Sequence, residues 1–225
     1  MSTYIDAARW FKKSFGSRIQ PELAGTPFTV DLLAAIAIQE TFEVWGRIYK
    51  QFENPVDVLP LCVGDVISAP TRTAFPKSKA ELLAVSNGAQ MFDIAHEALV
   101  EMAKHAPEYK KYADNPDRFC HAFGIFQYDI QFFKNDPDFF LQKQWGDLDA
   151  CLTRCIAELK RVLTKTFGPA KTALNDIELV YVAIGYNTGH VKITDGLKQG
   201  FKDDTGKFYG EYVNEYLQAA HHAAV

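Results

Sequence analysis

The feature that most constrains this chain is an apolar run, LLAAIAIQET, which covers residues 32–41 and includes the carboxyl group of Glu40. Leu, Ala and Ile favour helices and pack well in protein cores, so the run predicts a buried helix. Thr29 can cap its start, and the pattern continues through Trp45 toward Tyr49. Glu40 then has two interpretations. Its carboxyl group either reaches solvent, or is desolvated enough to stay protonated near neutral pH and act as a general acid.

The composition is that of an ordinary globular chain. Its 225 residues, 48% of them hydrophobic, are enough for one large domain or two small ones with a substantial core. The net charge of −4 gives no bulk basic character, so no nucleic-acid partner is expected. No stretch is long and apolar enough for a membrane span or for the core of a secretory signal peptide. We therefore expect no membrane insertion, and synthesis in the cytoplasm.

Cysteine spacing gives no indication of a metal centre. There is no CxxC pair, and two cysteines four residues apart would share a helix face, where disulfide geometry is rarely reached. We expect buried, reduced thiols, and neither a metal nor another cofactor. The four cysteines are Cys62, Cys120, Cys151 and Cys155.

Helical periodicity recurs along most of the chain and predicts a mainly α fold. The first helix is expected to end at Gly16, and Asn115-Pro116-Asp117 to start a helix that continues through residues 119–133. The proline-rich residues 52–90 are the least regular part, without strand-like alternation. Besides the helix that carries Glu40, helices are expected over residues 4–15, 79–84, 91–104, 119–133, 139–167, 176–186 and 209–220.

Three segments with polar residues beside apolar runs follow one another along the chain: AIAIQET with Glu40, AFGIFQYD at 122–129, and AIGYNTGH at 183–190. In this order they resemble the lysozyme-like superfamily of lytic transglycosylases and goose-type lysozymes. That family has an apolar helix ending in Glu-Ser, a GLMQ-like turn, an AYNxG motif and a final helix with a tyrosine. The matching segments here are Glu40-Thr41, residues 124–127, residues 185–189 and residues 208–213.

The resemblance covers roughly residues 30–50, 119–133 and 178–218, and it has clear departures. Thr41 replaces Ser, Phe126 replaces Met and Gly185 replaces Ala. The distance along the chain from Glu40 to the turn is also longer than the family pattern. We therefore expect a single catalytic domain over residues 1–225, with residues 50–118 as an insertion that could reshape the groove.

The resemblance implies a glycosidase that cleaves β-1,4 bonds of peptidoglycan, with Glu40 as the general acid at the leaving oxygen. A glycine in the turn lets the backbone approach a sugar, and side-chain amides suit N-acetyl and hydroxyl groups. The tyrosines could support Glu40 by hydrogen bonding, stack on a sugar, or pack in the core. The predicted substrate-binding residues are Gly124, Gln127, Tyr186, Asn187 and Tyr209.

A second carboxylate decides the reaction. Lytic transglycosylases work with one Glu, and the sugar's own hydroxyl attacks to give a 1,6-anhydro product. Inverting lysozymes need another carboxylate to activate water. Asp129 follows the turn as in goose-type lysozymes, so it is the candidate base, although an Asp there can also cap a helix. Asp117 is interpreted instead as a helix N-terminal residue after Pro116.

Other functions stay open at this point. A chitin-cleaving hydrolase on the same fold is a close alternative, and a non-catalytic glycan-binding or structural protein is another. A helical protein-interaction domain would make the order of the motifs a coincidence. Without an export signal, a wall-cleaving enzyme would reach its substrate through a holin, a dedicated secretion machine or delivery as a toxin, and a toxin would imply an immunity protein as partner.

Overall fold

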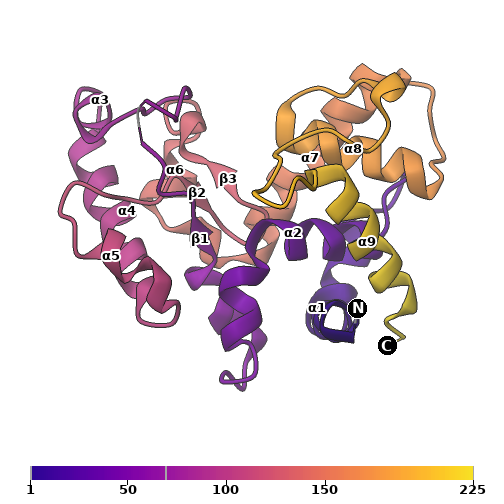
Figure 1. Ribbon diagram of the computed structural model, residues 1–225, viewed down its shortest axis with the longest axis horizontal. Coiled ribbons are helices and arrows are strands. Elements are labelled where there is room, and N and C mark those ends of the chain that lie inside the picture. The colour runs from indigo at the N-terminus through magenta and orange to yellow at the C-terminus, as the bar shows by residue number, and fades with distance from the viewer. Residues whose placement is uncertain (1, 69, 225) are drawn as a thin grey trace. The chain divides into compact units, whose positions relative to one another are not determined.

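The structure, a computed structural model, describes residues 2–68 and 70–224 and is mainly helical, which confirms the predicted fold class (Figure 1). The chain divides into two compact units. Unit 1 comprises Met1–Glu40 and Leu152–Val225, and unit 2 comprises Thr41–Cys151. The division falls inside two helices, α2 (Val30–Ile48) and α7 (Leu148–Phe167).

Unit 1 is built from long helices around an apolar core. Helix α9 (Tyr209–His222) packs against α1 (Ser2–Glu22) and α8 (Asp176–Thr188). Lys12 ties α1 to the end of α9, because its ammonium group donates to the carbonyl oxygens of Ala220 and Ala223 at 3.0 and 2.9 Å. A short 3₁₀ turn, η5 (Ile193–Asp195), lies in the connection from α8 to α9.

The helix ends of unit 1 follow the sequence signals with one exception. Thr29 caps α2 by accepting a hydrogen bond from the backbone N–H of Leu32 at 3.1 Å, as predicted. Gly189 ends α8 in the left-handed conformation, with φ of 76°. The prediction that Gly16 ends the first helix is wrong. Helix α1 continues to Glu22, because Phe15 and Ile19 are both buried and their packing outweighs the low helix propensity of one glycine.

Unit 2 combines shorter helices with a small antiparallel sheet. The strands are β1 (Val63–Gly64), β2 (Ala122–Phe123) and β3 (Tyr128–Asp129), in the order β1-β2-β3. Its longest helix within the unit is α4 (Gly88–Ala103). The other elements are η1 (Pro55–Leu61), α3 (Lys79–Leu83), η2 (Pro107–Tyr109), α5 (Lys110–Ala113), η3 (Ile130–Phe132), α6 (Pro137–Leu141) and η4 (Gln144–Gly146).

The helix predicted over residues 119–133 is wrong, because this segment forms a β-hairpin. Ala122 pairs with Asp129 and Phe123 with Tyr128 across a four-residue loop. The first and last loop residues have positive φ, 81° for Gly124 and 55° for the residue at 127, which a helix cannot contain. Strand β1 from the predicted insertion pairs with β2, so residues 50–118 supply part of this sheet.

Two further helix predictions need correction. The long helix expected from residue 139 to 167 is divided, because Lys143 lies in the left-handed region with φ of 53° between α6 and α7. No helix begins at Asp117 either. Its exposed carboxylate pairs instead with Lys79 at 3.0 Å. The short helix predicted over residues 79–84 and the helix near residues 91–104 are confirmed by α3 and α4.

All four cysteines are buried free thiols, as predicted. Among the described residues, no helix combines the length and the apolar character that crossing a bilayer requires.

Gly185 offers a test of packing at a position where the resembled family has alanine. A methyl group there would lie 2.3 Å from Cγ1 of Val162 on α7. We therefore expect Gly185→Ala to lower the free energy of unfolding by about 1–3 kcal/mol, since overpacking outweighs the gain in helix propensity.

The control background is Val162→Ala, which removes the side-chain atoms that a methyl group on Gly185 would meet. Urea unfolding of the single and double variants should show that Gly185→Ala does not lower the free energy of unfolding when Val162 is already alanine. An equal cost in both backgrounds would rule out the steric explanation.

Candidate active site

Glu40 sits where an apolar helix meets a partly accessible surface. The α2 residues from Leu32 to Ile38 are buried, and the side chains of Gln39 and Glu40 are half-buried. A carboxylate in such a place loses much of its hydration, which disfavours its charged form. The sequence pattern therefore positions the carboxyl group by burying the turns that precede it.

Tyr209, the first residue of α9, is the hydrogen-bond partner of this carboxyl group. Its hydroxyl donates to Oε1 of Glu40 at 2.8 Å, and the ring is only 2% exposed. Burial and then the neighbouring Glu40 raise the pKa of Tyr209 well above its ordinary value. The phenol therefore stays neutral and acts as a donor that orients Glu40.

The balance of these effects places the Glu40 pKa near neutrality. Burial raises the pKa of Glu40 from 4.5 to about 7, and the hydrogen bond from Tyr209 opposes that rise. Near neutral pH, Glu40 is then protonated in about half of the protein molecules. A carboxyl group in this range can both give and take a proton, as general acid–base chemistry requires.

Tyr186 and Asn187 of α8 belong to the same unit as Glu40. Tyr186 is half-buried, and burial, followed by Cys155 and Glu40, raises its pKa well above the ordinary value. Asn187 is exposed, and its Oδ1 would lie 3.2 Å from a methyl group placed on Gly200. Tyr186 also has a side-chain hydrogen bond with the Cys155 thiol, a neighbour that no motif in the sequence indicates.

Gly124 and Gln127 serve the hairpin turn of unit 2. The Gln127 side chain donates from Nε2 to the carbonyl oxygens of Gly124 at 2.8 Å and Cys62 at 3.3 Å. A methyl group on Gly124 would lie 2.6 Å from Sγ of Cys151, so a thiol fills the space that this glycine leaves. The structure thus gives both residues a role in shaping the turn, and their contact with a sugar stays a prediction.

Thr41, which follows Glu40 in the chain, holds this turn. Its buried hydroxyl donates to the carbonyl oxygen of Ile125 at 2.9 Å. A side-chain hydrogen bond also joins it to the thiol of Cys62. In the Glu40-Thr41 pair, the first residue is therefore titratable and the second holds the hairpin turn by a hydrogen bond. This role of Thr41 follows from its partner Ile125 and not from the sequence motif.

Asp129 is committed to a structural ion pair. Its Oδ1 accepts from the guanidinium of Arg72 at 2.7 Å and from the backbone N–H of Gln131 at 2.7 Å, so it caps η3. Arg72 is 7% exposed and also pairs with Asp65 at 3.0 Å. Arg72 carries no signal in the sequence, because its proline-punctuated segment has no periodicity that would orient it.

The predicted residues thus fall into two groups by unit. Glu40, Tyr186, Asn187 and Tyr209 belong to unit 1, and Gly124, Gln127 and Asp129 belong to unit 2. Within the described part of the chain, no group of three or more His, Cys, Asp or Glu side chains is arranged to hold a metal ion. Comparisons with protein-family models, curated proteins and solved structures each find no match.

The raised pKa of Glu40 predicts a specific pH dependence of stability. Between pH 4.5 and about 7 the folded protein holds a proton that the unfolded chain releases, so stability falls as pH rises through this window. Relative to Glu40→Gln, the wild type should lose on the order of 3 kcal/mol of unfolding free energy between about pH 4 and pH 8. Urea unfolding across this range measures it, and a difference independent of pH would contradict the assignment.

Proposed function

We propose that this protein is a glycosidase that cleaves β-1,4 bonds between N-acetylhexosamine units of peptidoglycan, with Glu40 as its general acid. The observation that carries the proposal is a half-buried carboxyl group with a pKa of about 7 and a neutral tyrosine donor at 2.8 Å. Cleavage of a glycosidic bond needs a protonated acid at the leaving oxygen. The order of the Glu-Thr, GIFQ and GYNTG motifs supports the same class of reaction.

The residues of unit 1 suit a mechanism with one carboxyl group. Protonated Glu40 gives its proton to the glycosidic oxygen as the bond to the anomeric carbon breaks. The C6 hydroxyl of the same sugar then attacks that carbon, and the Glu40 carboxylate takes the hydroxyl proton, which yields a 1,6-anhydro product. A pKa near 7 serves both steps, and Tyr209 fixes the carboxyl group throughout.

The surroundings of Asp129 favour this lytic transglycosylase chemistry over inverting hydrolysis. An inverting enzyme needs a second carboxylate with lone pairs available to activate water. Asp129 instead shares one oxygen between the Arg72 guanidinium and the Gln131 N–H. Two donors therefore already bind this oxygen of Asp129, and the ion pair with a buried guanidinium commits the side chain to holding its loop.

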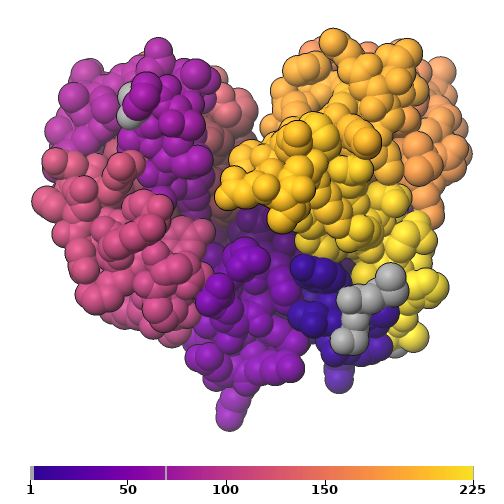
Figure 2. All heavy atoms as spheres, in the orientation of Figure 1, coloured from indigo at the N-terminus to yellow at the C-terminus, as the bar shows by residue number. Residues whose placement is uncertain are grey.

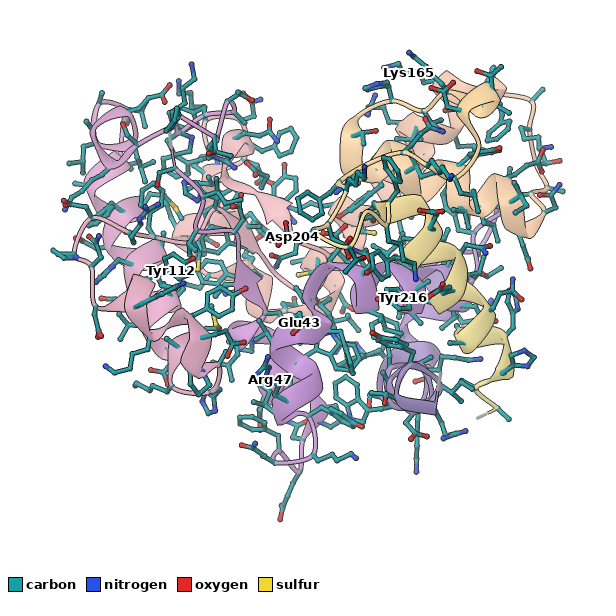
Figure 3. The ribbon with its side chains drawn as sticks, in the orientation of Figure 1. Glu43, Arg47, Tyr112, Lys165, Asp204 and Tyr216 are labelled. Atoms are coloured by element: carbon teal, nitrogen blue, oxygen red, sulfur yellow. The ribbon has the colours of Figure 1, made fainter. Side chains whose placement is uncertain are left out.

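The first test compares Glu40→Gln with Glu43→Gln on purified peptidoglycan. Glutamine keeps the shape of Glu40 and removes its proton, so product formation should fall by roughly 10²–10⁴. Glu43 lies on α2 with its side chain 84% exposed beside Arg47, and both are labelled in Figure 3. Its variant should retain wild-type activity.

Mass spectrometry of the released fragments identifies the reaction. Anhydro-muropeptides are expected, and reducing-end products would assign a hydrolase instead. Products from chitin oligomers alone would transfer the proposal to chitin. Equal activity of wild type and Glu40→Gln would refute the role of Glu40.

Asp65→Asn is a matched control for Asp129→Asn. Each carboxylate pairs with Arg72, and each accepts a backbone N–H two residues further along the chain. Both variants should lower the unfolding free energy by about 1–3 kcal/mol. Below their unfolding temperatures both should form anhydro products at rates within a few-fold of wild type. A loss of activity confined to Asp129→Asn would instead make Asp129 the base.

A further inference from the structure

One aromatic side chain of unit 1 is exposed without an evident structural purpose. Phe201 is 67% exposed, the largest fraction among the exposed large apolar side chains of the described residues. It lies in the connection between α8 and α9, the yellow-orange segment at the surface of this unit in Figure 2. Single exposed apolar residues are common, so exposure alone assigns no role.

The backbone of Phe201 is hydrogen-bonded to the backbone of Tyr209, the residue that orients Glu40. Its carbonyl oxygen accepts from the N–H of Tyr209 at 2.8 Å, and the carbonyl of Gln199 accepts from Gly210 at 3.1 Å. Tyr209 in turn donates its hydroxyl to Glu40. A single tyrosine side chain therefore separates the Phe201 backbone from the acid.

Gly200 makes this close approach feasible. It has φ of 85°, and a methyl group there would lie 2.6 Å from Cβ of Tyr209 and 3.2 Å from Oδ1 of Asn187. A larger residue at position 200 could not lie so near both predicted site residues. The backbone of Gly200 thus lies against Asn187 and Tyr209, and Phe201 follows it in the chain.

The connection is also internally fixed, which lowers the entropy lost when a ligand binds. Lys202 forms a bridge with Phe208, and the backbone N–H of Asp203 donates to the carbonyl of Lys207 at 3.0 Å. The Asp203 carboxylate accepts from the N–H groups of Thr205 and Lys207 at 2.9 and 3.0 Å. These bonds restrict the backbone that follows Phe201 in the chain, so less chain entropy is lost when a ligand binds there.

We propose that Phe201 is a stacking residue that holds one saccharide ring of the glycan next to the ring at Glu40. This inference rests on the proposed glycosidase function. The C–H face of a pyranose is flat and apolar, and an exposed phenyl ring offers it an electron-rich face of matching size. Phe132, also partly exposed, is a weaker candidate, because it already stacks on Tyr128 with ring centroids 4.9 Å apart.

The test uses the full chain with Phe201→Ala, Phe201→Trp and, as the matched control, Ile193→Ala. Ile193 is 47% exposed in η5 of the same connection, but it is aliphatic. On purified peptidoglycan, Phe201→Ala should raise KM about 3- to 10-fold with kcat within about twofold, and tryptophan should restore binding. Ile193→Ala should change neither constant.

Binding is measured separately in the Glu40→Gln background, with soluble peptidoglycan fragments as ligand. Added fragments should blue-shift the emission of the Phe201→Trp variant, and Phe201→Ala should weaken binding by the same factor as in the kinetics. A structural role for Phe201 would produce neither signature. Unfolding temperatures of the three variants should match that of the wild type.

The outcomes separate this inference from the proposed function. Cleavage by the wild type with unchanged KM and binding in Phe201→Ala overturns the stacking role alone. Binding that depends on Phe201 without any cleavage overturns the catalytic proposal and keeps the stacking role. Neither cleavage nor binding overturns both.

Discussion

The hydrogen bond between Tyr209 and Glu40 joins residues that are 169 positions apart in the chain. Desolvating a carboxyl group is costly unless the group is neutral or finds a partner. Here the pKa of Glu40 is raised to about 7 and the Tyr209 hydroxyl is its partner. The apolar turns of α2 remove water, and the first residue of α9 supplies the donor. Packing of α9 against α1 and α8 is therefore what keeps the donor in place.

Two carboxyl groups of this chain are given opposite properties by their surroundings. Glu40 is half-buried beside a neutral phenol, and its pKa rises to about 7. Asp129 is paired with a buried guanidinium and caps a short helix. One group is suited to proton transfer and the other to holding a loop, which is the basis for proposing chemistry with a single acid.

Three glycines show how the absence of a side chain acts in this fold. At Gly124 the space is filled by Sγ of Cys151, and at Gly185 it is filled by Val162. At Gly200 it lets the connection before α9 approach Tyr209. The first two serve internal packing, and contact of Gly124 with a sugar stays a prediction. The third precedes Phe201, whose carbonyl oxygen accepts from the backbone N–H of Tyr209.

Periodicity alone was enough to predict most long helices and the mainly α class, because an amphipathic or buried helix repeats its apolar residues at fixed spacing. It also located Glu40 and Tyr209 at helix positions next to the core. It failed over residues 119–133, where positive φ at Gly124 and Gln127 turns a helix-like pattern into a hairpin. It also failed at Gly16, where the buried neighbours Phe15 and Ile19 continue the helix.

The amino-acid sequence by itself determined which groups are available: a carboxyl group after an apolar run, amides and a tyrosine in ordered motifs, and four thiols without metal spacing. Tertiary structure decided what each group can do. The Glu40 pKa depends on the water excluded around it and on a distant phenol, and the fate of Asp129 depends on Arg72, 57 residues away. Burial and long-range partners set these roles, and neither burial nor a distant partner can be read from local spacing.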